Sequence, residues 1–227
     1  MRTQVAVLSG VLFAACGALA ASEDREVPAF DSVHVASGIR ATIAVGPRKP
    51  VHLEADKEVL EIIETRVEDG TLHVGFKPRA HLSSSGEVTV SIQTPELHAV
   101  AGSGGAVVRA TFTRSTDSAI SASGGSELHV RGVDARDLAV EGSGGAILDV
   151  TGRADQLSLQ LSGGSQLDAR QFEARNVAVQ GSGGSVAELR ASGKVRGSLS
   201  GGSEMHVRGG ARASVATSGG SEISVDN

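Results

Sequence analysis

The chain has 227 residues, enough for one good-sized domain, and its formal net charge is −5. It contains no Trp, no Tyr and only five Phe, so any core must be built from aliphatic side chains. The sequence shows no basic patch and no aromatic platform for stacking bases, which argues against a nucleic-acid partner.

Residues 1–20 are typical of a secretory leader. One Arg precedes an apolar run, and a small-residue cleavage signal ends at Ala20, before Ala21. The apolar run is too short for a stable membrane span. We therefore expect an exported protein, periplasmic or extracellular and not transmembrane. The alternative is a lipoprotein anchored at Cys16, the only cysteine of the chain.

Residues 21–29 are a polar lead-in, and 30–227 are expected to form a single domain in two parts. The first part, 30–96, is irregular and is expected to cap the N-terminal end of a stack, because repeat stacks need capped ends. Asp69-Gly70 predicts a hairpin across 61–76, preceded by a short helical turn at 56–60. Further strands are expected at 30–35, 39–45, 51–55 and 88–92, with a loop at 77–86.

A Ser-Gly-Gly tripeptide recurs seven times in the second part, 97–227. Successive serines are 18–20 residues apart, and so steady a period is typical of a stacked-repeat fold. The tripeptides are Ser103-Gly104-Gly105, Ser123-Gly124-Gly125, Ser143-Gly144-Gly145, Ser162-Gly163-Gly164, Ser182-Gly183-Gly184, Ser200-Gly201-Gly202 and Ser218-Gly219-Gly220.

Apolar and polar residues alternate on both sides of each tripeptide. Leu128 and Val130, for example, enclose His129. This period of two predicts one strand before and one strand after each tripeptide. A strand-turn-strand unit that returns to the same register is best satisfied by an all-β fold, a parallel β-helix with coils of 18–20 residues. The glycines are expected to supply positive φ, and the serines to form a hydroxyl ladder along one edge.

Several segments together resemble a known family. They are the opening from Phe30 to Gly38, the hairpin from Glu68 to Val74, the run from Val88 to Leu97 and the serial Ser-Gly-Gly units. The combination resembles the putative auto-transporter adhesin family, head GIN domain, over about residues 28–226. The resemblance implies a secreted bacterial domain of right-handed β-helix type, and it carries over no catalytic residues. The family's usual repeat is Ser-Gly-Ser-Gly or similar, so the constant second Gly is a departure.

One column of the repeat contains three acidic residues that could act together chemically. Asp149, Asp168 and Glu188 stand at the sixth place after three consecutive serines, so their Cβ atoms are expected about 5 Å apart. Stacked carboxylates can bind Ca²⁺ or raise one another's pKa for general acid catalysis. The alternative is a solvated acidic ladder without a chemical function. The lack of Trp and Tyr for stacking a sugar ring supports this alternative. We expect no catalytic residue and no cofactor, with this trio as the one weak metal candidate.

The sequence thus favours a non-catalytic structural or binding module of the bacterial envelope, similar to an adhesin, for a protein or polysaccharide ligand. Two alternatives stay open. One is a carbohydrate-active enzyme that uses the acidic trio. The other is a scaffold that self-associates through an open C-terminal edge near Ile223 and Val225, because an unpaired strand edge is a template for another chain.

Overall fold

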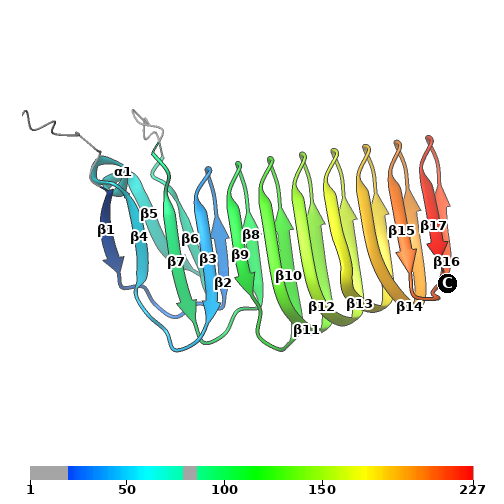
Figure 1. Ribbon diagram of the computed structural model, residues 1–227, viewed down its shortest axis with the longest axis horizontal. Coiled ribbons are helices and arrows are strands. Elements are labelled where there is room, and N and C mark those ends of the chain that lie inside the picture. The colour runs from blue at the N-terminus through cyan, green and yellow to red at the C-terminus, as the bar shows by residue number, and fades with distance from the viewer. Residues whose placement is uncertain (1–19, 79–85, 227) are drawn as a thin grey trace, which may run out of the picture.

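The protein, described here from a computed structural model over residues 20–78 and 86–226, is mostly β. Its strands stack side by side along one axis into a β-solenoid (Figure 1). The predicted leader up to residue 19 and the alternative anchor Cys16 lie outside the described residues. Within those residues no helix has the length and apolar character needed to cross a membrane.

The regular coils pair in parallel and in register, as the repeat predicts. The bounds are β8 Ala99–Gly102, β9 Val107–Thr111, β10 Ser115–Ala122, β11 Glu127–Gly142, β12 Ile147–Leu161, β13 Gln166–Gly181, β14 Val186–Leu199, β15 Glu204–Arg208, β16 Arg212–Thr217 and β17 Glu222–Asp226. Each of β11 to β14 bends once, so the solenoid has two layers (Figure 1). The pre-turn layer holds the segments that lead into each Ser-Gly-Gly, and the post-turn layer holds those that follow it.

Each Ser-Gly-Gly forms a tight turn between the two layers. In the second repeat the Ser126 N–H donates to the Ser123 carbonyl at 3.2 Å, and Gly124 and Gly125 have φ of 61° and 74°. Two positive φ values in succession define a type I′ turn, which explains the paired glycines. The first glycine also needs close approach, because a Cβ on Gly163 would lie 2.9 Å from the Gly144 nitrogen. The expectation of positive φ is confirmed.

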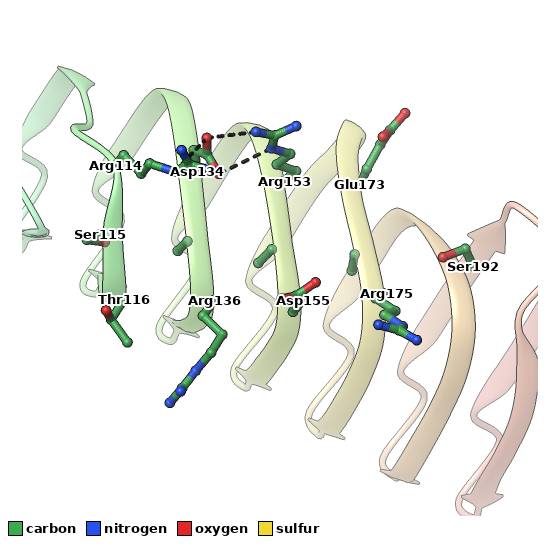
Figure 2. A pocket seen from close by; sticks show the side chains of 13 residues that line it. Arg114, Ser115, Thr116, Asp134, Arg136, Arg153, Asp155, Glu173, Arg175 and Ser192 are labelled. Carbon is green, nitrogen blue, oxygen red and sulfur yellow. Dashed lines mark hydrogen bonds and ion pairs between the residues drawn. The ribbon is translucent and has the colours of Figure 1, made fainter.

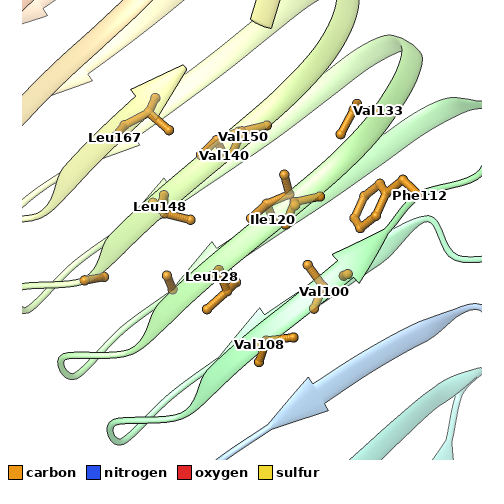
Figure 3. Packing of buried hydrophobic residues seen from close by; sticks show 14 of the residues in the cluster. Val100, Val108, Phe112, Ile120, Leu128, Val133, Val140, Leu148, Val150 and Leu167 are labelled. Atoms are coloured by element: carbon orange, nitrogen blue, oxygen red, sulfur yellow. The ribbon is translucent and has the colours of Figure 1, made fainter. Parts of the chain in front are cut away.

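The core lies between the layers and is aliphatic. Leu128, Leu148 and Leu167 pair in register and form one buried ladder, which Ile120 and Val140 face from the other layer (Figure 3). Each such side chain contributes about 1.5–3 kcal/mol by leaving water.

Small residues fill the narrow corner beside each turn, where a larger side chain would clash. Ser126 is fully buried there, and its hydroxyl donates to the Gly102 carbonyl at 3.0 Å.

The irregular N-terminal part supplies the end of the stack, in an order that differs from chain order. β2 Ser32–Val35 and β3 Arg40–Val45 form a coil that pairs with β8 and β9 on one side. On its other side lie β6 Thr71–Phe76 and β7 Thr89–Thr94. The turn of this coil places Ser37 and Gly38 at positive φ, in register with Gly104 and Gly105. The stack therefore continues past the first Ser-Gly-Gly with a degenerate repeat.

Antiparallel strands complete the N-terminal end. β4 Val51–Asp56 pairs with β7, and β5 Ile63–Glu68 pairs with β6 through the Asp69-Gly70 turn, which confirms the predicted hairpin. Between β4 and β5 lies α1 Lys57–Ile62, a short helix close to the predicted 56–60. Regular parallel coils thus end against antiparallel strands and one helical turn.

The polar lead-in contains a strand that its composition gives no reason to expect. β1 Ala20–Arg25 pairs antiparallel with β4, and polar contacts hold it there. The Arg25 guanidinium donates to the carbonyls of Ile63 and Leu60, each at 2.8 Å. Backbone pairing and the hydrogen bonds of this guanidinium hold β1 in place, whereas an apolar stripe holds the strands elsewhere.

Candidate functional site

The acidic trio stands where the repeat predicts, on the outer surface of the post-turn layer. Asp149 pairs in register with Asp168, and Asp168 with Glu188. All three side chains are partly exposed, between 37% and 44%. The register is therefore as expected, and the chemistry depends on what surrounds these carboxylates.

A cation lies among these carboxylates. The alignment of the sixth place after each serine does not reveal this cation. Arg170, two residues after Asp168, donates through Nε to Asp168 Oδ1 at 2.9 Å and lies 3.5 Å from Glu188 Oε2. The hydrogen bond from Arg170 lowers the pKa of Asp168 below its usual value. The side chain of Asp149 is held from the other side by His129, whose Nδ1 lies 3.3 Å from Asp149 Oδ2.

Arg170 thus lies between two of the three carboxylates, and His129 contacts the third. Within residues 20–78 and 86–226, no group of three or more His, Cys, Asp or Glu is arranged to hold a metal ion. A lowered pKa is the opposite of what a general acid needs near neutral pH.

A groove runs along the pre-turn layer beside the turns, with a volume of about 370 Å³. We call it the serine groove. It crosses several coils, and its walls carry hydroxyl and amide groups from equivalent positions. Its main polar residues are Ser143, Ser162, Ser182 and Ser200 of the repeat, with Gln160, Gln180 and Ser198.

The serine groove has a regular spacing and little charge. Gln160 pairs in register with Gln180, so their amides lie one strand spacing apart, about 4.8 Å. Glu141 is the only charged residue in the wall. The serines are held by the backbone ladder, as where the Ser182 N–H donates to the Leu161 carbonyl at 2.9 Å. The result is a rigid, repeating array of neutral donors and acceptors.

A second groove, of about 640 Å³, lies on the bend side of the same layer, and its described wall mixes four Arg with three Asp or Glu residues. Asp134, Arg153 and Glu173 pair in register and alternate in sign. Figure 2 shows Arg114 and Arg153 on either side of Asp134, at 3.4 and 2.9 Å from its Oδ2. The hydrogen bond from Arg153 lowers the pKa of Asp134. These charges neutralise one another.

A third groove, nearer the last coils, is basic. Its volume is about 790 Å³, and its walls carry Arg175, Lys194, Arg196 and Arg212 with no Asp or Glu. We call it the cationic groove. The expectation that the protein has no basic patch is wrong, because coiling brings together cations that are up to 37 residues apart in the sequence. Aligning the positions six residues before each serine is the signal that finds Lys194 and Arg212.

The comparisons identify the family. Residues 29–211 match the family described as putative auto-transporter adhesin, head GIN domain. The chain belongs to this family. Comparison with curated proteins gives no match.

Solved structures share the fold at low identity. A putative adhesin from Bacteroides fragilis is 14% identical with a TM-score of 0.82, over 92% of this chain and 97% of that one. A protein from Parabacteroides distasonis described as a putative lipid binding protein is 15% identical with a TM-score of 0.69, over 92% and 96%. A putative adhesin from the same organism is 16% identical with a TM-score of 0.66, over 92% and 97%. At these identities the likeness shows the fold alone.

Proposed function

We propose that the protein is a non-catalytic binding module of the bacterial envelope, and that it holds an extended polysaccharide along the serine groove. One observation carries the proposal: neutral hydroxyl and amide groups repeat at one strand spacing over successive coils of a rigid sheet. A polysaccharide presents hydroxyl groups at a regular spacing too. Many weak hydrogen bonds, each worth about 0.5–1.5 kcal/mol, then add up along the chain.

The family supports this assignment through its description as adhesin-like. We also propose that residues 1–20 are the export leader, that the mature chain acts in the periplasm or outside the cell, and that residues 30–227 form one right-handed solenoid domain. The enzyme alternative is weakened by Arg170, which occupies the acidic trio. The groove instead offers a surface along which a polymer can lie without being cut.

A second candidate function rests on the last coil. Within the described residues, β16 pairs only with β14 and β17 only with β15, and Ile223 and Val225 are partly buried. Such an edge can add a strand from another molecule. Sedimentation of the wild type and of Ile223→Lys tests this self-association. Oligomers that the substitution abolishes would support it, and a monomer at all concentrations would exclude it.

Immobilised dextran, β-glucan and alginate test the binding function. We expect retention on at least one of these polymers, and a loss of several-fold in affinity for the double variant Gln160→Ala/Gln180→Ala. Thr42→Ala/Ser91→Ala, on the other layer, is the matched control and should bind like the wild type. Polymer length after long incubation should not change. Retention on none of the three, or shortening of the polymer, would overturn the proposal.

A further inference from the structure

One outer column of the pre-turn layer changes its charge steadily along the solenoid. Six residues before successive serines, and paired in register from coil to coil, stand Asp117, Asp137, Gln156, Asn176, Lys194 and Arg212. The column therefore passes from acidic through neutral amides to basic. Another column on the same layer alternates in charge instead, as at Asp134 and Arg153, which form an ion pair.

The basic end of this column is not neutralised. Lys194 and Arg212 pair directly across β14 and β16, and the like charges of their side chains repel each other. Arg196 lies two residues further on the same outer surface, and Arg175 belongs to the preceding coil. None of these four side chains forms an ion pair with a described residue, in contrast to Arg136, Arg153 and Arg170.

Such an arrangement costs stability in the free protein and favours an anion. Lys194, Arg196 and Arg212 border a concavity whose described wall contains no Asp or Glu, and they create a local positive potential on a chain whose net charge is −5. Arg175 lies beside them and also borders the second groove, near Asp155. A guanidinium group can donate two parallel hydrogen bonds to two oxygens of one carboxylate or sulfate group. Gln156 and Asn176 line the same groove and supply neutral hydrogen-bonding groups beside the cations.

We propose that the cationic groove binds the carboxylate or sulfate groups of an acidic polysaccharide. This inference rests on the proposed function, because it names the charge class of the polymer that lies along the same layer. Asp117, at the other end of the column, repels anionic groups there, whereas the charge of Asp137 is offset by its ion pair with Arg136. The acidic stretch of the polymer is therefore held at the last coils, and neutral sugars extend along the serine groove.

A polysaccharide fits this surface better than a nucleic acid does. The walls of both grooves hold hydroxyl, amide and guanidinium groups, and neither includes an aromatic residue on which a base could stack.

Dextran sulfate and dextran, which share one backbone, make a matched pair of probes. Binding of both polymers is measured for the wild type and for Lys194→Gln/Arg196→Ser/Arg212→Gln. These replacements copy Gln156 and Ser158, which hold the equivalent positions two coils before Lys194 and Arg196 and three coils before Arg212, so the fold should tolerate them. We expect the wild type to bind dextran sulfate at least about tenfold more tightly than dextran, and the variant to lose about tenfold for dextran sulfate alone.

The control Arg109→Gln/Arg131→Gln/Arg208→Gln removes the same charge from the post-turn layer, and it should bind dextran sulfate within about twofold of the wild type. An equal loss in this control would overturn the inference, because binding would then follow net charge. Equally tight binding of single-stranded oligo-dT would also overturn it in favour of nucleic acid.

The two proposals can fail separately. If Gln160→Ala/Gln180→Ala weakens binding and the cationic variant does not, the inference fails alone. If only the cationic variant weakens binding, the serine groove fails and the inference stands.

Discussion

Gly197 pairs with Val179 so closely that a Cβ atom on Gly197 would lie 1.7 Å from the Val179 carbonyl oxygen. Gly197 also has a φ of +145°, in the region that favours glycine. The repeat places Val or Leu at the equivalent position in most other coils, so the sequence column alone makes this glycine look like a weak point. The structure shows that the local backbone requires it.

Gly197→Ala should therefore destabilise the protein by about 3 kcal/mol or more, because backbone strain and a steric clash add. Urea unfolding followed by circular dichroism measures this as a lower midpoint with an unchanged slope. The control is Gly164→Asn, where a Cβ meets nothing within 4 Å and only the positive φ is unfavourable. It should cost about 1 kcal/mol. Equal losses in the free energy of unfolding for the two variants would contradict this interpretation.

Phe172 is fully buried among the aliphatic side chains of the regular coils. It pairs with Gly152 of the preceding coil, and its ring lies in the core. Phe172→Ala should cost about 3–5 kcal/mol, since it leaves a cavity between two stacked coils. Ile147→Ala is the control, because Ile147 is 47% exposed, and it should cost less than about 1 kcal/mol. A Phe172→Ala variant as stable as the control would show that the coils close the cavity.

Arg170 sets the acidity of the carboxylate ladder. In Arg170→Gln the pKa of Asp168 should rise towards its usual value of 3.8, because the hydrogen bond that lowers it is gone. In the wild type the lowered pKa contributes stability above pH 3.8, and this contribution is lost as pH falls through the folded-state pKa. The variant should lack it. A carboxylate titration by NMR measures the shift, and an unchanged Asp168 pKa would contradict the assigned ion pair.

His52 links β1 to β4 through a 2.6 Å contact between its Nδ1 and Asp24 Oδ1. The hydrogen bonds to Asp24 and then Glu54 raise the pKa of His52 above 6.5. The sign follows: the contact stabilises β1 fully below pH 6.5 and weakens as pH rises through the raised pKa. Amide exchange in β1 should accelerate over that interval in the wild type but not in His52→Gln. A pH-independent rate, after correction for intrinsic exchange, would exclude the link.

The regular coils could be predicted from the sequence because the repeat fixes both period and register. The column of Asp149, Asp168 and Glu188 is a direct result of aligning the serines. The hairpin at Asp69-Gly70 follows equally from local turn chemistry. Each of these features depends on residues close together in the chain or on one repeated position.

What sequence reasoning missed depends on contacts between columns or on the order of stacking. Arg170 donates a hydrogen bond to Asp168, two residues earlier, and the alignment of a single column of the repeat does not predict this contact. The coil of β2 and β3 lies between β6–β7 and β8–β9, although it precedes both in the chain. β1 has no apolar alternation and is held by Arg25. The cationic groove gathers its Arg and Lys residues from three coils, and the overall acidic charge conceals it.

Hydrogen exchange with bound alginate maps where a polysaccharide lies on the solenoid. We expect slower exchange in the second halves of β12 to β14 and in the Ser-Gly-Gly turns beside them, with β9 and β15 unchanged. Protection centred on Asp149, Asp168 and Glu188 would place the ligand on the opposite layer and would contradict the proposed binding surface.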